Sequence, residues 1–182
     1  PLGAFKLVED TSTGGHYIPS QISTTNGSVT GSVYAKYISR FLRLTIHDAS
    51  NSNEWYSVIY DLQNGTINNS LAKTVTVFDS KIELISDGYY RCSITADLGT
   101  SASTVLYIQL SDGTAISSGD NRGRGSYTGD GTSGVYIFGA QLEEQSSATS
   151  YIPTKGSQIT RLSETASQTV PDGIINSSEG VL

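Results

Sequence analysis

The sequence predicts an all-β protein, a two-sheet antiparallel β-sandwich of the jelly-roll type. Apolar and polar residues alternate with period two in about eight to ten short runs, the pattern of strands with one buried face. Turn-forming pairs such as Asn-Gly and Asp-Gly separate several of these runs. No run repeats apolar residues at the helical period, and Tyr, Thr, Gly and Ser, which suit pleated surfaces and turns, are abundant.

The first two clear strands lie in residues 27–39 and 40–48. In the first, one side carries Val29, Gly31, Val33 and Ala35, and the other carries Ser32, Tyr34 and Lys36. In the second, Leu42, Leu44 and Ile46 alternate with Arg43, Thr45 and His47. Because side chains alternate across a strand, the apolar set of each run is expected to face the core and the polar set to face outward.

Two hairpins and a further strand follow. Residues 54–67 place Tyr56, Val58, Tyr60 and Leu62 on one side and turn at Asn64-Gly65, so another strand is expected next. Residues 81–98 turn at Asp87-Gly88 and continue with Tyr90, Cys92 and Ile94 inward against Tyr89, Arg91, Ser93 and Thr95 outward. Residues 104–113 place Leu106, Ile108 and Leu110 inward, with Tyr107 and Gln109 outward.

A long loop and a closing strand complete the pattern. Residues 115–134 are too rich in glycine for a strand and are predicted to form a surface loop. In residues 135–143, Tyr136, Phe138, Ala140 and Leu142 alternate with Ile137, Gly139, Gln141 and Glu143. This alternation places Ala140 and Leu142 in the core and Gln141 outside. Tyr151, Ile152 and Pro153 then lay the chain back across the sandwich, because proline fixes φ and lacks an N–H donor.

Charge and cysteine usage restrict the partners. The net charge is -6 and the basic residues are scattered, so neither nucleic acid nor an anionic membrane is an expected partner. No run of about 18 apolar residues exists, so no membrane insertion is predicted. The single cysteine, Cys92, lies in an alternating run and is predicted to be a buried, inert thiol.

The composition divides the chain into three parts. Residues 1–6 are interpreted as a cleavage remnant or linker, and residues 7–161 as the jelly-roll domain. Residues 162–182 are polar and turn-rich, and are interpreted as a linker and the start of a following domain. The chain has no methionine and is therefore expected to be a fragment of a longer protein.

Three stretches together carry a resemblance to a known family: DGYYRCSIT, YTGDGTSGVYIFGAQLEE and ATSYIPTKGSQITR. They resemble a jelly-roll domain, similar to carbohydrate-binding modules, that recurs in phage tail proteins and in secreted proteins of marine bacteria. TSTGGHYI, SVYAKYIS and YDLQNGT fit as well, so the resemblance covers most of Leu7 to Arg161. Tyr89 and Phe138 stand where this family usually has Trp. INSSEGVL, at the end of the chain, resembles the first strand of a concanavalin-A-like domain.

The resemblance implies a non-catalytic carbohydrate-recognition domain of a phage tail or fibre protein that binds host surface glycans, and therefore a virion or extracellular location. The expected partners are a polysaccharide or cell-surface glycan, other domains of the same tail protein, and further copies of the chain in a homo-oligomer. Two alternatives stay open. The chain could be the polysaccharide-targeting module of a secreted marine enzyme, or an architectural virion domain that binds no sugar.

The outward side of the strands is the expected sugar-binding surface, because sugars stack on aromatic rings and hydrogen-bond to planar polar groups. The candidate residues are Tyr34, Lys36, Arg43, His47, Trp55, Tyr89, Arg91, Tyr107, Gln109, Tyr127 and Gln141, with Asp61 nearby. For each of them an ordinary strand residue is an equal alternative. Tyr127 either closes over the surface or anchors the long loop, and Trp55 either stacks on a sugar or packs in the core.

No catalytic residue is predicted. His16 and His47 are the only histidines, and no metal-ligand pair, nucleophile elbow or phosphate loop is found. Glu143 and Glu144 are adjacent, so on a strand they would point to opposite faces and could not flank one glycosidic bond. No cofactor is expected, and a structural calcium ion bound by Glu9, Asp10 and Asp130 is a minor alternative.

Overall fold

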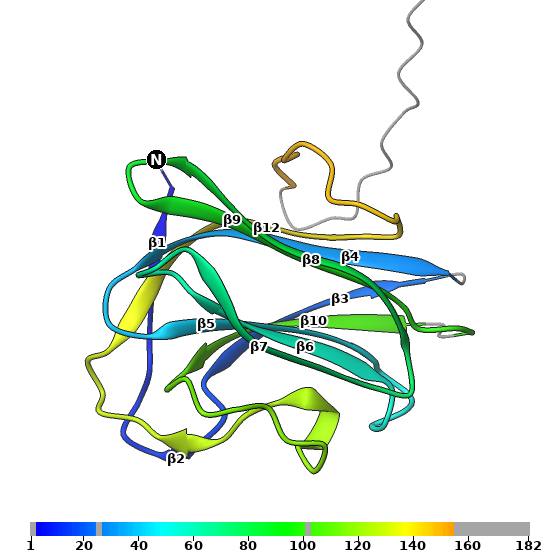
Figure 1. Cartoon of the computed structure of the whole chain (residues 1–182), viewed down its shortest axis with the longest axis horizontal. Coiled ribbons are helices and arrows are strands. Elements are labelled where there is room, and N and C mark those ends of the chain that lie inside the picture. Colours follow the sequence, from blue (N-terminus) through cyan, green and yellow to red (C-terminus); the bar gives the residue numbers. More distant parts are fainter. Residues whose placement is uncertain (1–2, 25–26, 101–102, 155–182) are drawn as a thin grey trace, which may run out of the picture.

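A computed structural model describes residues 3–24, 27–100 and 103–154 of the chain. Within these residues two five-stranded antiparallel sheets pack face to face, which confirms the predicted all-β sandwich (Figure 1). In order across the first sheet, the strands are β1 (Phe5–Val8), β12 (Gly134–Glu143), β4 (Ser28–Tyr37), β9 (Tyr89–Asp97) and β8 (Thr76–Ser86). In order across the second sheet, they are β3 (Tyr17–Ser23), β10 (Ser103–Ser111), β5 (Phe41–Asp48), β6 (Trp55–Asp61) and β7 (Thr66–Lys73).

The chain crosses repeatedly from one sheet to the other. β4 is followed by β5 in the opposite sheet, β7 by β8, and β9 by β10. β12 pairs with both β1 and β4, which come much earlier in the sequence. Strands on either side of each crossing therefore present their outward residues on opposite sides of the molecule, whereas β5–β7 share one sheet and β8–β9 the other.

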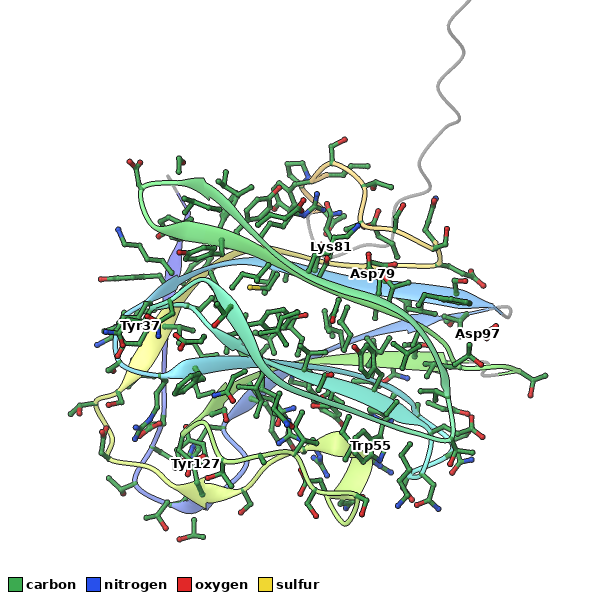
Figure 2. All side chains as sticks on the ribbon, viewed as in Figure 1. Tyr37, Trp55, Asp79, Lys81, Asp97 and Tyr127 are labelled. Carbon is green, nitrogen blue, oxygen red and sulfur yellow. The ribbon has the colours of Figure 1, made fainter. Side chains whose placement is uncertain are left out.

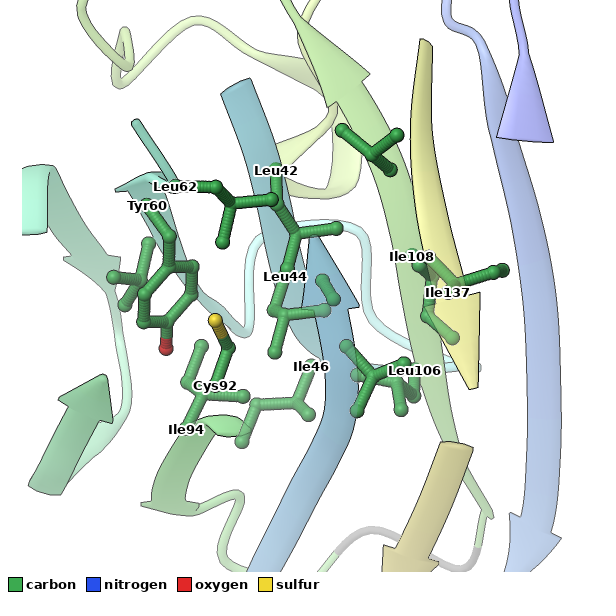
Figure 3. Close-up of a cluster of buried hydrophobic side chains, with 14 of the residues drawn as sticks. Leu42, Leu44, Ile46, Tyr60, Leu62, Cys92, Ile94, Leu106, Ile108 and Ile137 are labelled. Atoms are coloured by element: carbon green, nitrogen blue, oxygen red, sulfur yellow. The ribbon is translucent and has the colours of Figure 1, made fainter. Parts of the chain in front are cut away.

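The core between the sheets follows the predicted alternation (Figures 2 and 3). The buried set includes Val33, Ala35, Leu42, Leu44, Ile46, Tyr56, Val58, Tyr60, Leu62, Cys92, Ile94, Leu106, Ile108 and Leu110. Each fully buried aliphatic side chain contributes roughly 1.5–3 kcal/mol. The hydroxyl of Tyr60 donates to the carbonyl of Ser93 over 2.6 Å, which satisfies this buried polar group. Burial raises the pKa of Cys92, as expected for an inert thiol.

Both predicted hairpins are present, one with a two-residue turn at Asp87-Gly88 and the other with a longer turn, residues 62–65, that includes Asn64-Gly65. Asp87 and Gly88 have φ values of 52° and 75°, the left-handed conformation that a two-residue hairpin requires. Gly65 has φ 68° between β6 and β7, and a Cβ there would lie 2.8 Å from the hydroxyl of Tyr90. Glycine is therefore required at position 65 for both reasons.

The closing strand β12 corrects one sequence prediction. Val135 and Ile137 point into the core, and the register with β4 shifts between Phe138 and Gln141. Gly139, with φ 58°, allows this bulge, and after it Leu142 packs against the core as predicted. Ala140 lies within the bulge and is exposed, so its assignment to the core was wrong.

The first sheet has irregular edges. β1 begins at Phe5, two residues before the predicted start of the domain, and pairs with β12. At the other edge, β8 contains two register shifts and the ion pair of Lys81 with Asp79 (2.8 Å), labelled in Figure 2. Bulges and charges of this kind disfavour pairing with another chain.

Two parts of the molecule cover the sandwich from outside (Figure 1). The cover loop, residues 112–133, lies over the second sheet and contains the single turn η1 (Asn121–Gly123) and β11 (Tyr127–Thr128). β11 pairs with β2 (Thr13–Gly14). The exit segment, residues 144–154, lies over the first sheet.

Some sequence predictions fall outside the described residues. These are the continuation of the exit from Lys155 to Arg161 and the linker and domain start assigned to residues 162–182. In the described part of the chain, no helix has the length and apolar character needed to cross a membrane.

Gly134→Ala tests how tightly β1 packs on β12. A Cβ at position 134 would lie 2.0 Å from the carbonyl oxygen of Leu7, so β1 must move away. We expect the free energy of unfolding in urea to fall by about 1–3 kcal/mol. Gly14→Ala is the control, since a Cβ there meets no atom within 4 Å, and it should change stability by less than about 0.5 kcal/mol. Equal unfolding midpoints for both variants would contradict this packing.

Candidate functional site

The predicted binding residues do not share one surface. Tyr34, Lys36, Tyr89, Arg91 and Gln141 lie on the outer face of the first sheet. Arg43, His47, Trp55, Tyr107 and Gln109 lie on the outer face of the second sheet, on the opposite side of the molecule. The expectation of a single binding face is therefore wrong, because the chain changes sheets after β4 and again after β9.

The exit segment occupies the outer face of the first sheet. Arg91 donates to the carbonyl of Thr149, and the Gln141 side chain accepts from the N–H of Ile152 over 2.5 Å. The ring of Tyr151 lies 5.1 Å from that of Phe138. The chain thus returns across the sandwich as predicted. Arg91 and Gln141 hold the protein's own backbone in a position where a ligand was expected.

Other aromatic and cationic residues on this face pair with each other. The ring of Tyr34 lies 5.9 Å from that of Phe138, and the guanidinium of Arg91 lies 5.5 Å from the Tyr34 ring. The ammonium of Lys36 lies 5.6 Å from the ring of Tyr89, which is only 9% exposed. These contacts stabilise the face internally.

The cover loop is fixed to the second sheet by Arg43. This guanidinium donates to Ser57 (2.8 Å), to the carboxylate of Asp120 (2.8 Å) and to the carbonyl of Gly123 (2.5 Å). Thr45 also donates to the Gly123 carbonyl over 3.0 Å. Arg43 is only 2% exposed, so it positions the loop and is not itself open to a ligand.

Trp55 packs beneath the cover loop. It is fully buried in a cluster with Ile59 and Ile116, and a Cβ on Gly123 would lie 2.7 Å from the indole. Gly123 also has φ 65°, so glycine is required where the loop approaches the ring. Of its two predicted roles, Trp55 therefore has the packing role, and its ring offers no platform to a sugar.

A stacked layer lies beside this cluster. The ring of His47 stacks on that of Tyr107, with centroids 5.0 Å apart and an angle of 7°, and its Nε2 lies 3.2 Å from the Tyr107 hydroxyl. The side chain of Gln109 donates to Thr45 over 2.9 Å. Burial lowers the pKa of His47, and its contact with the Asp48 carbonyl opposes this. The three predicted residues His47, Tyr107 and Gln109 are all buried, and they pack beneath the cover loop.

An open groove of about 450 Å³ lies above this layer. Its described lining residues are Gly15, Tyr17, Gly119, Asp120, Asn121, Arg124, Gly125 and Ser126. The guanidinium of Arg124 lies 5.0 Å from the ring of Tyr17 and 5.2 Å from that of Tyr107, and it donates to the Tyr17 hydroxyl. The rings of Tyr17 and Tyr107 meet edge to face at 4.8 Å. The groove therefore combines an aromatic ring with planar polar groups held in place.

Sequence reasoning missed the residues that line this groove. Asp120, Asn121 and Arg124 belong to residues 115–134, for which the sequence predicts only a surface loop because of their many glycines. The polar side chains between those glycines could have indicated a binding loop, since Asp, Asn and Arg are residue types that hydrogen-bond to sugars. Tyr17 gave no local signal, because β3 meets the loop only in the folded protein.

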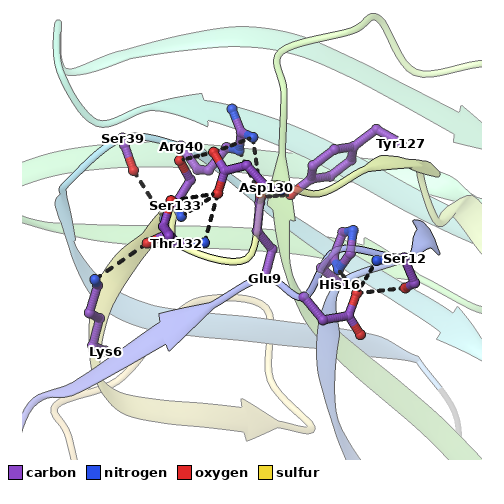
Figure 4. A network of polar contacts seen from close by, with 12 residues as sticks. Lys6, Glu9, Ser12, His16, Ser39, Arg40, Tyr127, Asp130, Thr132 and Ser133 are labelled. Carbon is purple, nitrogen blue, oxygen red and sulfur yellow. Dashed lines mark hydrogen bonds and ion pairs between the residues drawn. The ribbon is translucent and has the colours of Figure 1, made fainter.

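A polar network anchors the other end of the cover loop (Figure 4). The buried carboxylate of Glu9 accepts two bonds from Arg40 (2.7 and 2.6 Å), one from the Tyr127 hydroxyl (2.6 Å) and one from the N–H of Asp130 (2.7 Å). The Arg40 hydrogen bonds lower the pKa of Glu9, while burial opposes them. Tyr127 therefore anchors the loop, and lies 4.7 Å from the ring of His16.

The proposed calcium ligands do not fit a metal site. Arg40 donates to Glu9 and lies 3.4 Å from Asp130, so its guanidinium already supplies the positive charge between these carboxylates. Asp10 turns away to accept from Ser12 and to face His16 at 3.4 Å. Within residues 3–24, 27–100 and 103–154, no group of three or more His, Cys, Asp or Glu side chains could hold a metal ion.

No family model matches the chain, and no curated protein matches it. The fold and the groove thus define a class only: a two-sheet antiparallel β-sandwich whose second sheet carries a loop-covered aromatic and polar groove. The resemblance to phage tail domains stays a prediction from the sequence motifs.

Arg43→Met tests the attachment of the cover loop. Removing the guanidinium leaves the buried Gly123 carbonyl and the Asp120 carboxylate without their charged hydrogen-bond donor. This loss should lower the free energy of unfolding by about 3 kcal/mol. We expect the emission of Trp55, the only tryptophan, to shift to longer wavelength and become quenchable by acrylamide, while the β signal in circular dichroism persists. Lys73→Met removes one exposed bond to Ser118 in the same loop and should leave Trp55 unquenched. Identical quenching in both variants would rule out this role of Arg43.

Glu9→Gln tests the polar anchor through pH. The pKa of Glu9 is lowered below 4.5, so ionised Glu9 adds stability above that pH, and this is lost as the pH falls through the folded value. We expect the variant to be less stable than the natural chain by about 3 kcal/mol at pH 7, and the difference to shrink below pH of about 4. Thermal unfolding between pH 3 and 7 measures it. The control is Glu83→Gln, an exposed carboxylate on β8, and a pH-independent difference for Glu9→Gln would contradict the assignment.

Proposed function

We propose that this chain is a non-catalytic carbohydrate-recognition domain that binds a glycan in the groove between β3 and the cover loop. The observation that carries the proposal is the Tyr17–Arg124 pair beside Asp120 and Asn121. A sugar requires this mixture, because its C–H patches pack on aromatic rings and its hydroxyls bond to planar donors and acceptors.

Each lining group has a distinct role in this proposal. Tyr17 is half-buried, so that part of its ring contacts the sugar while the rest packs on Tyr107. Asn121 is exposed and supplies an amide donor and acceptor. Gly119 and Gly125 bring backbone groups into the wall of the groove, which allows close approach of a ring.

The groove supports binding without catalysis. Among its described lining residues Asp120 is the only carboxylate, and it is bound to Arg43 at 2.8 Å. Glycoside hydrolysis by the usual route needs two carboxyl groups on either side of the scissile bond. His47, in the stacked layer beneath the groove, is only 1% exposed and cannot reach a bound sugar.

The wider setting of the proposal comes from the sequence motifs. We place the domain in a phage tail or fibre protein at the virion surface, where it would help to recognise host glycans. One shallow groove gives modest affinity, so several copies on an oligomeric fibre would act together through their effective concentration. A polysaccharide-targeting module of a secreted marine enzyme would use the same groove.

A second candidate function is favoured by a specific observation. Both outer faces of the sandwich are covered by the protein's own chain, one by the cover loop and the other by the exit segment (Figure 1). Covered faces suit an architectural domain that spaces neighbouring parts of a virion and binds no sugar.

Affinity electrophoresis and a glycan array distinguish the two functions. We expect retention on at least one bacterial or marine polysaccharide, and a loss of about tenfold in affinity for Tyr17→Ala and Asn121→Ala, since both remove contacts to the sugar. Tyr136→Ala is the matched control, because this tyrosine is 39% exposed on the first sheet. An unchanged emission of Trp55 verifies that the cover loop is intact. Absence of retention on every glycan would favour the architectural function.

A further inference from the structure

Two arginines beside the groove have no acidic partner. Arg122 lies in η1 and Arg124 follows it, and in the described ranges neither forms an ion pair. The other two arginines of the loop region differ, because Arg40 is paired with Glu9 and Arg43 with Asp120. The negative charge of Asp120 is thus neutralised by Arg43 beneath the groove. Arg124 lines the groove, and Arg122 follows the lining residue Asn121 directly in the chain, so both bring positive charge to this end of the loop.

Contacts with neighbouring residues fix the guanidinium of Arg124 in the wall of the groove. Its guanidinium lies between the rings of Tyr17 and Tyr107, and its Nε and one Nη donate to the Asn121 carbonyl (3.4 Å) and the Tyr17 hydroxyl. Arginine has five N–H donors in a planar arrangement, so further donors remain for a ligand. Stacking restricts the rotamers before binding, which lowers the entropy lost when a ligand binds.

Arg122 occupies a backbone position that favours a different residue. Its φ and ψ of 56° and 30° lie in the left-handed region, where glycine or asparagine is usual. The backbone thus gives no reason for arginine at this position. Strained residues of this kind concentrate at functional sites.

The two charges act on their surroundings together. After burial, which is the largest cause, both Arg122 and Arg124 lower the pKa of His47 beneath the groove. Arg122 and Arg124 thus bring positive charge near His47 on a chain whose net charge is -6. At physiological salt, charges farther away than about 8 Å are largely screened, so the local arginines decide what binds.

We infer that the groove selects an acidic sugar, one that carries a carboxylate or a sulfate ester, and that Arg122 and Arg124 bind this group. The inference rests on the proposed glycan-binding function and names its ligand class. Guanidinium groups bind carboxylate and sulfate through parallel, charge-assisted hydrogen bonds. The net negative charge of the chain favours a glycan with sparse acidic residues over a dense polyanion.

Matched glycan pairs test the inference. Titration calorimetry would compare xylan with glucuronoxylan oligosaccharides, desulfated with intact κ-carrageenan oligosaccharides, and asialo with sialylated lactosamine, alongside the same acidic and neutral classes on an array. We expect the acidic member of the pair with the fitting backbone to bind at least tenfold more tightly. The carboxylate and sulfate pairs show which acidic group is preferred.

Substitutions separate the arginines from the fold. Arg122→Gly suits the backbone at that position, so we expect the thermal midpoint to stay unchanged while affinity for the acidic glycan falls about fivefold. Arg124→Gln should lower that affinity further and leave binding of a neutral glycan less affected. Lys6→Gln removes one positive charge from β1 of the other sheet and should change neither.

The outcomes distinguish this inference from the proposed function. Binding of neutral glycans only, with loss in Tyr17→Ala and none in Arg122→Gly, would overturn the acidic ligand and retain the glycan-binding domain. Equal affinity for both members of every pair would do the same. Binding of no glycan at all would overturn both.

Discussion

The buried guanidinium of Arg43 joins the cover loop to the second sheet, and the candidate site depends on this contact. Arg43 sits among Ser57, Asp120 and the Gly123 carbonyl, where burial lowers its pKa and the hydrogen bond to Asp120 opposes that effect. A charge taken out of water must be met by such partners. Because Gly123 is held there, Trp55 is buried beneath it, and the next residues of the loop are placed beside β3 as one wall of the groove.

On each outer face of the sandwich, polar strand residues bind a segment of the chain that covers the sheet. On the first sheet, Arg91 and Gln141 bind the exit segment, and the chain passes over Phe138. On the second sheet, Arg43 binds the cover loop but leaves a groove open at its margin. In both cases an outward polar residue of a strand satisfies backbone groups of a segment without regular structure, which is a general requirement for buried irregular chain. The groove differs because Arg124 and Asn121 still have donors to offer.

Charge in this protein is organised locally. Arg40 neutralises Glu9 and Asp130 at one end of the cover loop, and Arg43 neutralises Asp120 at the other. The position of Arg40 between Glu9 and Asp130 is one that a metal ion bound by these two carboxylates would otherwise occupy. Between these two neutralised points lie Arg122 and Arg124, whose charges are not matched within the described part of the chain. A net charge computed over the whole sequence hides this pattern, because it averages over pairs that only folding creates.

The period-two alternation by itself determined the all-β class, the core faces of β4, β5, β6, β9 and β10, and the positions of two hairpin turns, because these depend on neighbours along the chain. It failed in β12, where a bulge at Gly139 and Ala140 shifts the phase, so that Val135 and Ile137 face the core before the bulge and Leu142 after it. An uninterrupted alternation does not allow for such a shift. Only the tertiary structure decided which outward residues share a face, since the crossings between sheets send Tyr34 and Arg43 to opposite sides. It also decided that Trp55 is buried and that Tyr17 meets Arg124. These contacts join residues up to 107 positions apart, so no local pattern in the sequence encodes them.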